Sequence, residues 1–320
     1  STRVTFKGRN DATHFITAWY DGEVPADITV ELSTGVRVGP VGPGQLLEEH
    51  GLTIIQYAPG NEFYPWTSTS GDRAVWIRII GTFGGGSVEI KALDATAEPG
   101  FIDLYTDVSG PNLTPQVTFT SHLAEGRLQD WATTPGVIVA GDHNIRTEWV
   151  DIDGFARSIT DEGAVDDLWL KSSAGPSRDG RDYGVDVTAP GQNSFSPIGP
   201  DSYWATLRGN LPEGSDGLYG RFGGTSASAP IVLGAVALML QVNPTLTAEQ
   251  ARAILRGTAR IDEFTGDVPN VDWGFGKLDV HAAVGRSLAY GYSGPWFNPS
   301  QSGHGWFVEM LQGADGSQRL

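Results

Sequence analysis

Residues 223–241 decide the fold, and they read Gly-Gly-Thr-Ser-Ala-Ser-Ala-Pro-Ile-Val-Leu-Gly-Ala-Val-Ala-Leu-Met-Leu-Gln. Ser226 lies between a glycine-rich turn and a run of small and aliphatic residues, which predicts a buried helix reaching about Val242 and ending before Pro244. The N–H groups of a first helical turn have no intrahelical acceptor and attract negative charge, so the Ser226 N–H is placed to stabilise an oxyanion. The stretch predicts a nucleophilic serine, and a core helix with a serine cap is the alternative.

Small residues flank Ser226 on both sides. Gly223 and Gly224 remove Cβ atoms that would block an approaching backbone. Pro230 is expected near the end of the first turn, where its missing N–H costs little. Tight packing of the helix beneath the site is expected from three further small residues, Ala227, Ala229 and Gly234.

Three more motifs accompany the serine segment. They are Ser-Ser-Ala-Gly-Pro at 172–176, Asp-Val-Thr-Ala-Pro-Gly at 186–191 and Gly-Phe-Gly-Lys-Leu-Asp at 274–279. Together with Gly-Thr-Ser-Ala-Ser-Ala-Pro at 224–230 they resemble, in the same order, signatures of the subtilisin family of serine peptidases. The resemblance covers roughly residues 118–286. It implies a subtilisin-like α/β parallel sheet, of which this chain holds the second half, and endopeptidase activity through an acyl-enzyme on Ser226.

A serine hydroxyl is a weak nucleophile at neutral pH and needs a base. The resemblance implies an aspartate and then a histidine ahead of the serine, and Asp21 with His50 have a plausible spacing. The segment after His50, residues 52–57, reads as a strand where the family has a helix, so we expect a turn aspartate and a loop histidine instead. Asn61 resembles the family's oxyanion asparagine loosely, and we expect a turn residue there. The hypothesis is that the catalytic Asp and His, and the oxyanion Asn, precede Ser1.

Two rival hypotheses remain open. The segment around Ser226 also resembles the nucleophile motif of the sedolisins, in which a glutamate replaces the histidine base. Alternatively, a chain without a base is a catalytically dead peptidase-like binding module. The other histidines lack the motif and are expected to be surface or packing residues: His14, His122, His143, His281 and His304.

The composition limits which classes of binding partner are expected for this chain. The 320 residues carry 21 basic and 38 acidic groups, a formal net charge of -17, which disfavours nucleic acid and anionic membranes and agrees with a secreted or cell-surface protein. Protein or peptide substrates are what the resemblance implies. The absence of cysteine excludes disulfides and cysteine-ligated metals. No uninterrupted apolar stretch of eighteen residues occurs, so no membrane span is expected. Without a Met or a signal-type segment at Ser1, we expect a processed or trimmed chain.

The pattern divides the chain into three. Residues 1–117 show short alternating runs at 15–20, 28–32, 52–57, 74–80, 87–90 and 101–105, separated by Gly and Pro turns such as Gly39-Pro40. This pattern predicts an antiparallel β-sandwich, which is similar to the jelly-roll-like insert of some bacterial subtilisin relatives. Residues 118–287 predict the catalytic domain's C-terminal half, with a buried parallel strand at 137–141 and a capping box at Thr247 and Gln250. Residues 288–320 predict the start of a truncated β-rich domain.

Acidic residues are dense between 151 and 167. A calcium loop is a common accessory in the resembled family, but the spacing matches no EF-hand, so a solvated acidic loop is expected and no cofactor is required. The residues concerned are Asp151, Asp153, Glu162, Asp166 and Asp167.

Overall fold

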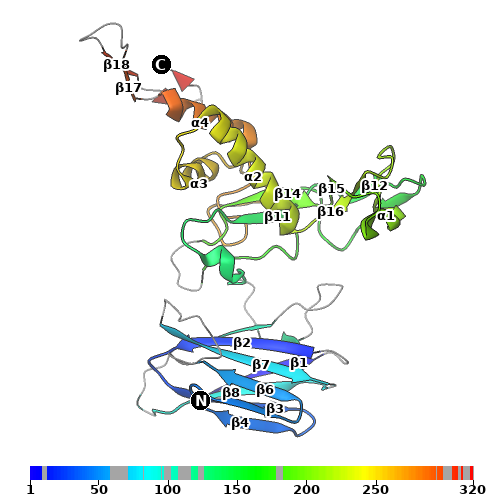
Figure 1. The fold of residues 1–320 in the computed structure, drawn as a ribbon, viewed down its shortest axis with the longest axis vertical. Helices are drawn as coiled ribbons and strands as arrows, with labels where there is room; N and C mark the ends of the chain where they lie inside the picture. The colour runs from blue at the N-terminus through cyan, green and yellow to red at the C-terminus, as the bar shows by residue number, and fades with distance from the viewer. Residues whose placement is uncertain are drawn as a thin grey trace. The chain divides into compact units, whose positions relative to one another are not determined.

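The chain folds into two compact units, unit 1 from Ser1–His122 and unit 2 from Leu123–Leu320. In Figure 1 unit 1 runs from blue to cyan and unit 2 from green to red. The structure is a computed structural model. It describes residues 1–8, 13–57, 71–81, 83–94, 96, 102–106, 117–121, 126–177, 183–292, 294–297, 305–308, 311–312 and 318–319.

Unit 1 consists of two five-stranded antiparallel sheets, with the strand orders β10-β1-β8-β3-β4 and β5-β6-β7-β2-β9. The first sheet contains β1 (Thr2–Gly8), β3 (Ala26–Leu32), β4 (Arg37–Val41), β8 (Gly86–Ala92) and β10 (Val117–Phe119). The second contains β2 (Thr13–Asp21), β5 (Leu46–Glu49), β6 (Leu52–Gln56), β7 (Asp72–Ile80) and β9 (Ile102–Thr106).

The two sheets of unit 1 share one hydrophobic core. Alternate residues of a strand point to the same face, so Ile16, Ala18 and Tyr20 of β2 are buried while their neighbours are more exposed. Buried side chains of β3 and β8 from the first sheet join those of β2, β6 and β7 from the second in one cluster. The alternating runs of the sequence therefore predicted six strands correctly, those at β2, β3, β6, β7, β8 and β9.

The interpretation of Gly39-Pro40 as a turn is wrong. Both residues lie within β4, which is an edge strand of the first sheet. Proline is tolerated at an edge because its missing N–H does not interrupt a ladder on both sides. The register between β3 and β4 shifts between Ile28 and Val30, where the extra residue of β4 is accommodated.

Unit 2 is built around two parallel strands, β11 (Ala140–Asn144) and β14 (Val187–Gln192). Among the described residues three longer helices follow, α2 (Thr225–Val242), α3 (Ala248–Gly257) and α4 (Val280–Tyr292), and α2 packs against β14 and α4. The predicted end of α2 at Val242 is confirmed. The capping box is also confirmed, because Gln250 N donates to Thr247 Oγ1 at 3.2 Å and Thr247 N donates to Gln250 Oε1 at 2.9 Å.

Shorter elements complete unit 2. They are η1 (Asp130–Thr133), β12 (Glu148–Val150), β13 (Ala156–Ser158), β15 (Ser194–Pro197), α1 (Tyr203–Thr206), η2 (Arg208–Asn210), β16 (Tyr219–Phe222), β17 (Gly294–Phe297), β18 (Gly305–Val308), β19 (Leu311–Gln312) and β20 (Gln318–Arg319). β17 pairs with β18. The β-rich segment predicted from residue 288 begins later, because α4 continues to Tyr292.

The buried parallel strand predicted at 137–141 differs from the structure. β11 begins at Ala140, and residues 137–140 are half-buried. Val139 is tied to Asp186 at the start of β14, since Val139 N donates to Asp186 Oδ2 at 2.7 Å. Among the described residues β14 is the one strand that pairs with β11, so the burial expected on both sides of an inner strand is not reached.

One face of α2 is exposed although the helix is apolar. Val232, Ala235 and Met239 are buried on the opposite face. We call the exposed face the α2 stripe; it consists of Ser226, Ala229, Pro230, Leu233, Gly234, Ala237, Leu238 and Leu240. The tight packing expected at Ala229 and Gly234 is therefore wrong within the described residues, where no atom from outside the local helix backbone lies within 4 Å of a Cβ added at Gly234.

By length and mean hydropathy (1.7), α2 is also the one helix among the described residues that is long and apolar enough to cross a membrane. A single helix that packs on β14 and α4 is weak support for a membrane span, because core helices of soluble domains have the same composition.

Candidate active site

Ser226 is exposed in the first turn of α2. The helix begins after Gly224, whose φ of 78° lies in the left-handed region that glycine adopts without strain. The ring of Trp169 flanks this turn, with ring atoms 3.5 Å from the position of a Cβ on Gly224. Among the described residues, neither the Ser226 hydroxyl nor its N–H has a hydrogen-bond partner. Both groups are therefore available to a ligand at the N-terminus of α2.

Pro230 is in the second turn of α2 rather than at the end of the first. The N–H that proline lacks would have bonded to the carbonyl of Ser226, four residues earlier. The Ser226 carbonyl consequently has no intrahelical donor.

Asp142 is fully buried beneath the first turn of α2. Its Oδ1 accepts hydrogen bonds from Ser228 Oγ at 2.7 Å, Gln192 N at 2.8 Å and Gly191 N at 3.0 Å. Its Oδ2 is buried without a partner among the described residues. Burial raises the pKa of Asp142 to about 6, against the opposing effect of these donors.

Gln192 connects β14 to the N-terminus of α2. Its side-chain Oε1 accepts a hydrogen bond from Gly224 N at 2.6 Å, and its Nε2 donates to Glu162. A Cβ added at Gly223 would lie 2.2 Å from Gln192 Oε1, so a side chain at position 223 would displace the Gln192 amide. Gly223 thus makes room for Gln192, in addition to the role expected for it in admitting a substrate.

Asp21 and His50 cannot form a catalytic pair. Asp21 is the last residue of β2 and pairs with Asp72 at one end of β7, whereas Gly51, next to His50, bonds to Ile80 at the other end. Eight steps along a strand separate these ends by about 27 Å. Asp21 accepts a hydrogen bond from the N–H of Glu23 and His50 has a φ of 53°, so they are the turn aspartate and loop histidine that the sequence predicted.

No other described histidine contacts Ser226. His14 is buried in unit 1 against Phe83, with ring centroids 4.7 Å apart, and His281 is exposed on α4. Asn61, His122 and His304 lie outside the described residues.

The acidic residues between 151 and 167 do not converge. Asp151 pairs with Arg157 at 2.6 Å, Asp153 with Arg208, and Asp166 with Lys277 at 4.0 Å. Glu162 accepts from Gln192. Among the residues described, no three His, Cys, Asp or Glu side chains form a group able to hold a metal ion.

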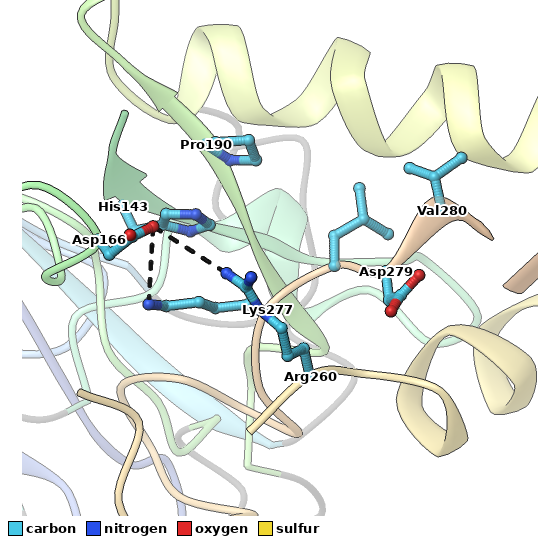
Figure 2. Close-up of a pocket in the computed structure, with 8 residues that line it drawn as sticks. His143, Asp166, Pro190, Arg260, Lys277, Asp279 and Val280 are labelled. Carbon is cyan, nitrogen blue, oxygen red and sulfur yellow. Dashed lines mark ion pairs between the residues drawn. The ribbon is translucent and has the colours of Figure 1, made fainter. Parts of the chain in front are cut away.

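A cavity of about 390 Å³ lies on the other face of the β11–β14 pair, where Figure 2 shows the side chains that line it. Side chains alternate along a strand, so His143 points away from the face on which its neighbour Asp142 meets α2. The buried Lys277 amine bonds to Asp262 at 2.7 Å and, with Arg260, faces Asp166. Burial and the positive charge of Lys277 lower the pKa of His143 to about 4. His143 is therefore neutral at physiological pH.

Asp142 and His143 are expected to give opposite pH dependences of stability. The folded pKa of Asp142 lies above its unfolded value of 3.8, so its contribution to stability falls as pH rises from about 4 to 6. The folded pKa of His143 lies below 6.5, so its contribution rises as pH rises from about 4 to 6.5. Each shift corresponds to about 3 kcal/mol, and the two nearly cancel.

Urea unfolding of unit 2 at pH 4.5 and 6.0 tests this cancellation. Asp142→Asn should gain about 2 kcal/mol in unfolding free energy between these pH values relative to the wild type, and His143→Gln should lose about as much. The two variants control for each other, and equal pH slopes in both would contradict the pKa assignment.

The sequence did not single out Asp142, Gln192 or Asp186 as contacts of the site or its support. Asp186 is buried and bonds to Arg252 at 2.7 Å and Arg256 at 2.5 Å on α3. Two signals were available in the sequence: Asp142 directly follows an apolar run, and Gln192 directly follows a recognised motif.

An exposed serine in the first turn of an apolar helix, packed on parallel strands, is the arrangement of the subtilisin-like hydrolases. The sequence profile of the subtilase family, peptidase S8, matches residues 125–292, and the chain belongs to this family. This is the family of the subtilisin-like serine peptidases, as the order of the four motifs predicted.

Relatives support the same placement. Serine protease AprX of Bacillus subtilis is 29% identical over 171 residues, covering 49% of this chain and 37% of AprX. Fervidolysin of Fervidobacterium pennivorans is 37% identical over 106 residues, covering 32% of this chain and 15% of fervidolysin. The CspB protease of Clostridium perfringens shares the fold, with a TM-score of 0.62 and 20% identity over 90% of this chain and 55% of that one. The chain thus spans less than half the length of AprX or fervidolysin.

Proposed function

We propose that the chain is the nucleophile-bearing part of a serine endopeptidase, and that polypeptide upstream of Ser1 supplies the catalytic Asp and His. The observation that carries the proposal is the position of Ser226. Its hydroxyl and N–H are both open at the N-terminus of α2, and no described residue provides a base. Within the part of the chain that the structure describes, α2 provides the nucleophile and an oxyanion donor but no group that takes the proton.

The mechanism follows from these groups. Ser226 Oγ attacks the carbonyl carbon of a peptide bond, and its proton passes to the upstream histidine, which delivers it to the leaving amine. The Ser226 N–H donates to the oxyanion, assisted by the positive end of α2. Water then attacks the acyl-enzyme ester, and the histidine returns a proton to Oγ.

The α2 stripe supports this proposal, because it offers a surface on which the upstream polypeptide could pack. Residues 226, 229, 230, 233, 237 and 240 recur at helical spacing, so Ser226 is at the top of a continuous exposed apolar face. Leu233 is 67% exposed and Leu238 46%, in a helix whose opposite face is core. A segment that covers this stripe lies next to Ser226 and can bring a histidine to its hydroxyl. Such packing would also explain why one face of this apolar helix is exposed among the described residues.

Labelling with a fluorophosphonate tests the proposal. The full-length polypeptide should be labelled at Ser226, and residues 1–320 alone should be labelled far more slowly because no base activates Oγ. Mass spectrometry of the labelled peptide identifies the serine. Absence of labelling in the folded full-length protein would support instead the catalytically dead binding module.

The sedolisin alternative is distinguished by pH. With an imidazole base, kcat/KM of the full-length protein rises through the imidazole range, near pH 6.5, whereas a carboxylate base is already ionised there. We further propose that the β unit formed by residues 1–122 is an insert within the catalytic domain and that the protein works outside the cytoplasm, with which its net charge of -17 agrees.

A further inference from the structure

The N-terminus of α2 is capped by a side chain from the strand β14. Gly224 has no side chain to cap the helix, and α2 has no side-chain cap of its own. The Gly224 N–H is satisfied by Gln192 Oε1 at 2.6 Å, across the gap between β14 and α2. Gln192 itself is 4% exposed, and its backbone N–H is fixed to Asp142 at 2.8 Å. The acceptor that orients the turn before Ser226 is thus held on a rigid strand.

The orientation of the Gln192 amide is determined by its two partners. Gly224 N–H is a donor, so the amide oxygen must face it. The Glu162 carboxylate accepts only, so the amide nitrogen must face Glu162. The reversed amide would lose both bonds. One planar group therefore links Glu162 to Gly224 in a single orientation.

Glu162 is in turn anchored to β11. Asn144, which is fully buried, donates from Nδ2 to the Glu162 carbonyl at 2.8 Å and to the Asp167 carbonyl at 3.3 Å. The Asp166 N–H also donates back to the Asn144 carbonyl at 2.8 Å. The loop of residues 161–168 is consequently tied to the end of β11 at one side and to α2, through Gln192, at the other.

We propose that Gln192 is a positioning residue for Ser226, and that its link to Glu162 makes the loop of residues 161–168 set the geometry of the nucleophile. The proposal rests on the proposed function of Ser226. The Gln192 side chain bonds to Gly224 and Glu162 rather than to Ser226. It fixes the N–H of Gly224, two residues before Ser226, and so the direction in which the Ser226 hydroxyl and N–H face the substrate. Such positioning is expressed in kcat more than in KM, because the substrate's binding contacts are unchanged.

Four variants of the full-length polypeptide test the link. Gln192→Leu removes both bonds and should lower kcat about tenfold with KM within about twofold. Gln192→Glu keeps the acceptor for Gly224 but places a second carboxylate against Glu162. The two adjacent carboxyl groups then share one proton with a raised pKa. We expect kcat to fall as pH rises through this pKa, because the hydrogen bond between positions 192 and 162 forms only while that proton is present. Glu162→Gln leaves an amide pair and should have a small effect.

The exchange variant, which combines Gln192→Glu with Glu162→Gln, is the decisive protein. The new carboxylate at position 192 would accept from Gly224 while the new amide at position 162 donates to it, which restores both bonds with the groups interchanged. We expect kcat within about threefold of the wild type and loss of the pH dependence seen in Gln192→Glu, a non-additivity that two independent structural defects would not show. An exchange variant as poor as Gln192→Glu alone would overturn the proposal.

Two controls separate this inference from the proposed function. Gln56→Leu removes an equally buried amide from unit 1, where Gln56 bonds to the carbonyls of Ala26 and Val41, and should leave kcat unchanged. Fluorophosphonate labelling of the wild type shows independently whether Ser226 is a nucleophile. If it is not, hydrogen exchange still decides the structural claim, since Gln192→Leu should speed exchange of the Gly224 amide about tenfold, and unchanged exchange would overturn it.

Discussion

Ser226→Ala is expected to lower kcat of the full-length protein by on the order of 10⁶-fold, the scale found when the serine nucleophile of subtilisin is removed. The substitution deletes the one atom that forms the acyl-enzyme and leaves the N–H that binds the oxyanion. Ser226 is exposed and has no hydrogen-bond partner among the described residues. The free energy of unfolding of the variant should therefore differ from that of the wild type by less than about 0.5 kcal/mol. Steady-state hydrolysis of a peptide substrate and urea unfolding give the two numbers.

Ser228→Ala is the matched control for this variant. Ser228 is two residues further along α2, but its hydroxyl is buried and donates to Asp142 at 2.7 Å. Its removal leaves the buried carboxyl with one donor fewer and should cost about 1–3 kcal/mol of stability, with a loss in kcat far smaller than that of Ser226→Ala. A protein that retained a few per cent of activity without the Ser226 hydroxyl would rule Ser226 out as the nucleophile.

Asp186→Ala should have the largest effect on stability. The Asp186 carboxylate is fully buried and binds Arg252, Arg256 and the N–H of Val139, which joins α3 to the start of both parallel strands. Removing it leaves two half-buried guanidinium groups without their shared partner. Losses of about 3–5 kcal/mol follow when one side of a buried ion pair is deleted. Denaturant unfolding monitored in unit 2 measures the change.

Asp153→Ala provides the comparison. Asp153 also pairs with an arginine, Arg208, but its side chain is 34% exposed and that of Arg208 58%. Solvent screens such a pair, so its loss should cost less than about 1 kcal/mol. Equal destabilisation by Asp153→Ala and Asp186→Ala would show that burial does not determine the strength of these pairs.

Local sequence patterns predicted the parts of the fold that depend on nearby residues. The alternation at Phe15 to Tyr20 predicted β2, and the capping residues Thr247 and Gln250 predicted the start of α3, because both signals are complete within one element. The proline within β4 misled because its tolerance depends on β4 being an edge strand, which is a property of the whole sheet.

The contacts around the candidate site could not be predicted in the same way. Asp142, Gln192 and Ser228 meet only because β11, β14 and α2 pack together, although the first and the last are 86 positions apart in the sequence. The exposed face of α2 was also unforeseen, since its composition is that of a fully buried helix. Composition reports what a helix prefers, and only the packed structure shows which neighbours it has.

The bare face of α2 also constrains how the polypeptide folds. Under the proposal that an upstream segment covers the α2 stripe, its leucines become buried only when that segment arrives, so contacts of high sequence separation must close a long loop. Until then unit 2 presents a row of apolar side chains that favours association between chains over correct assembly. Docking of that proposed segment is therefore the step at which we expect slow closure and misassembly.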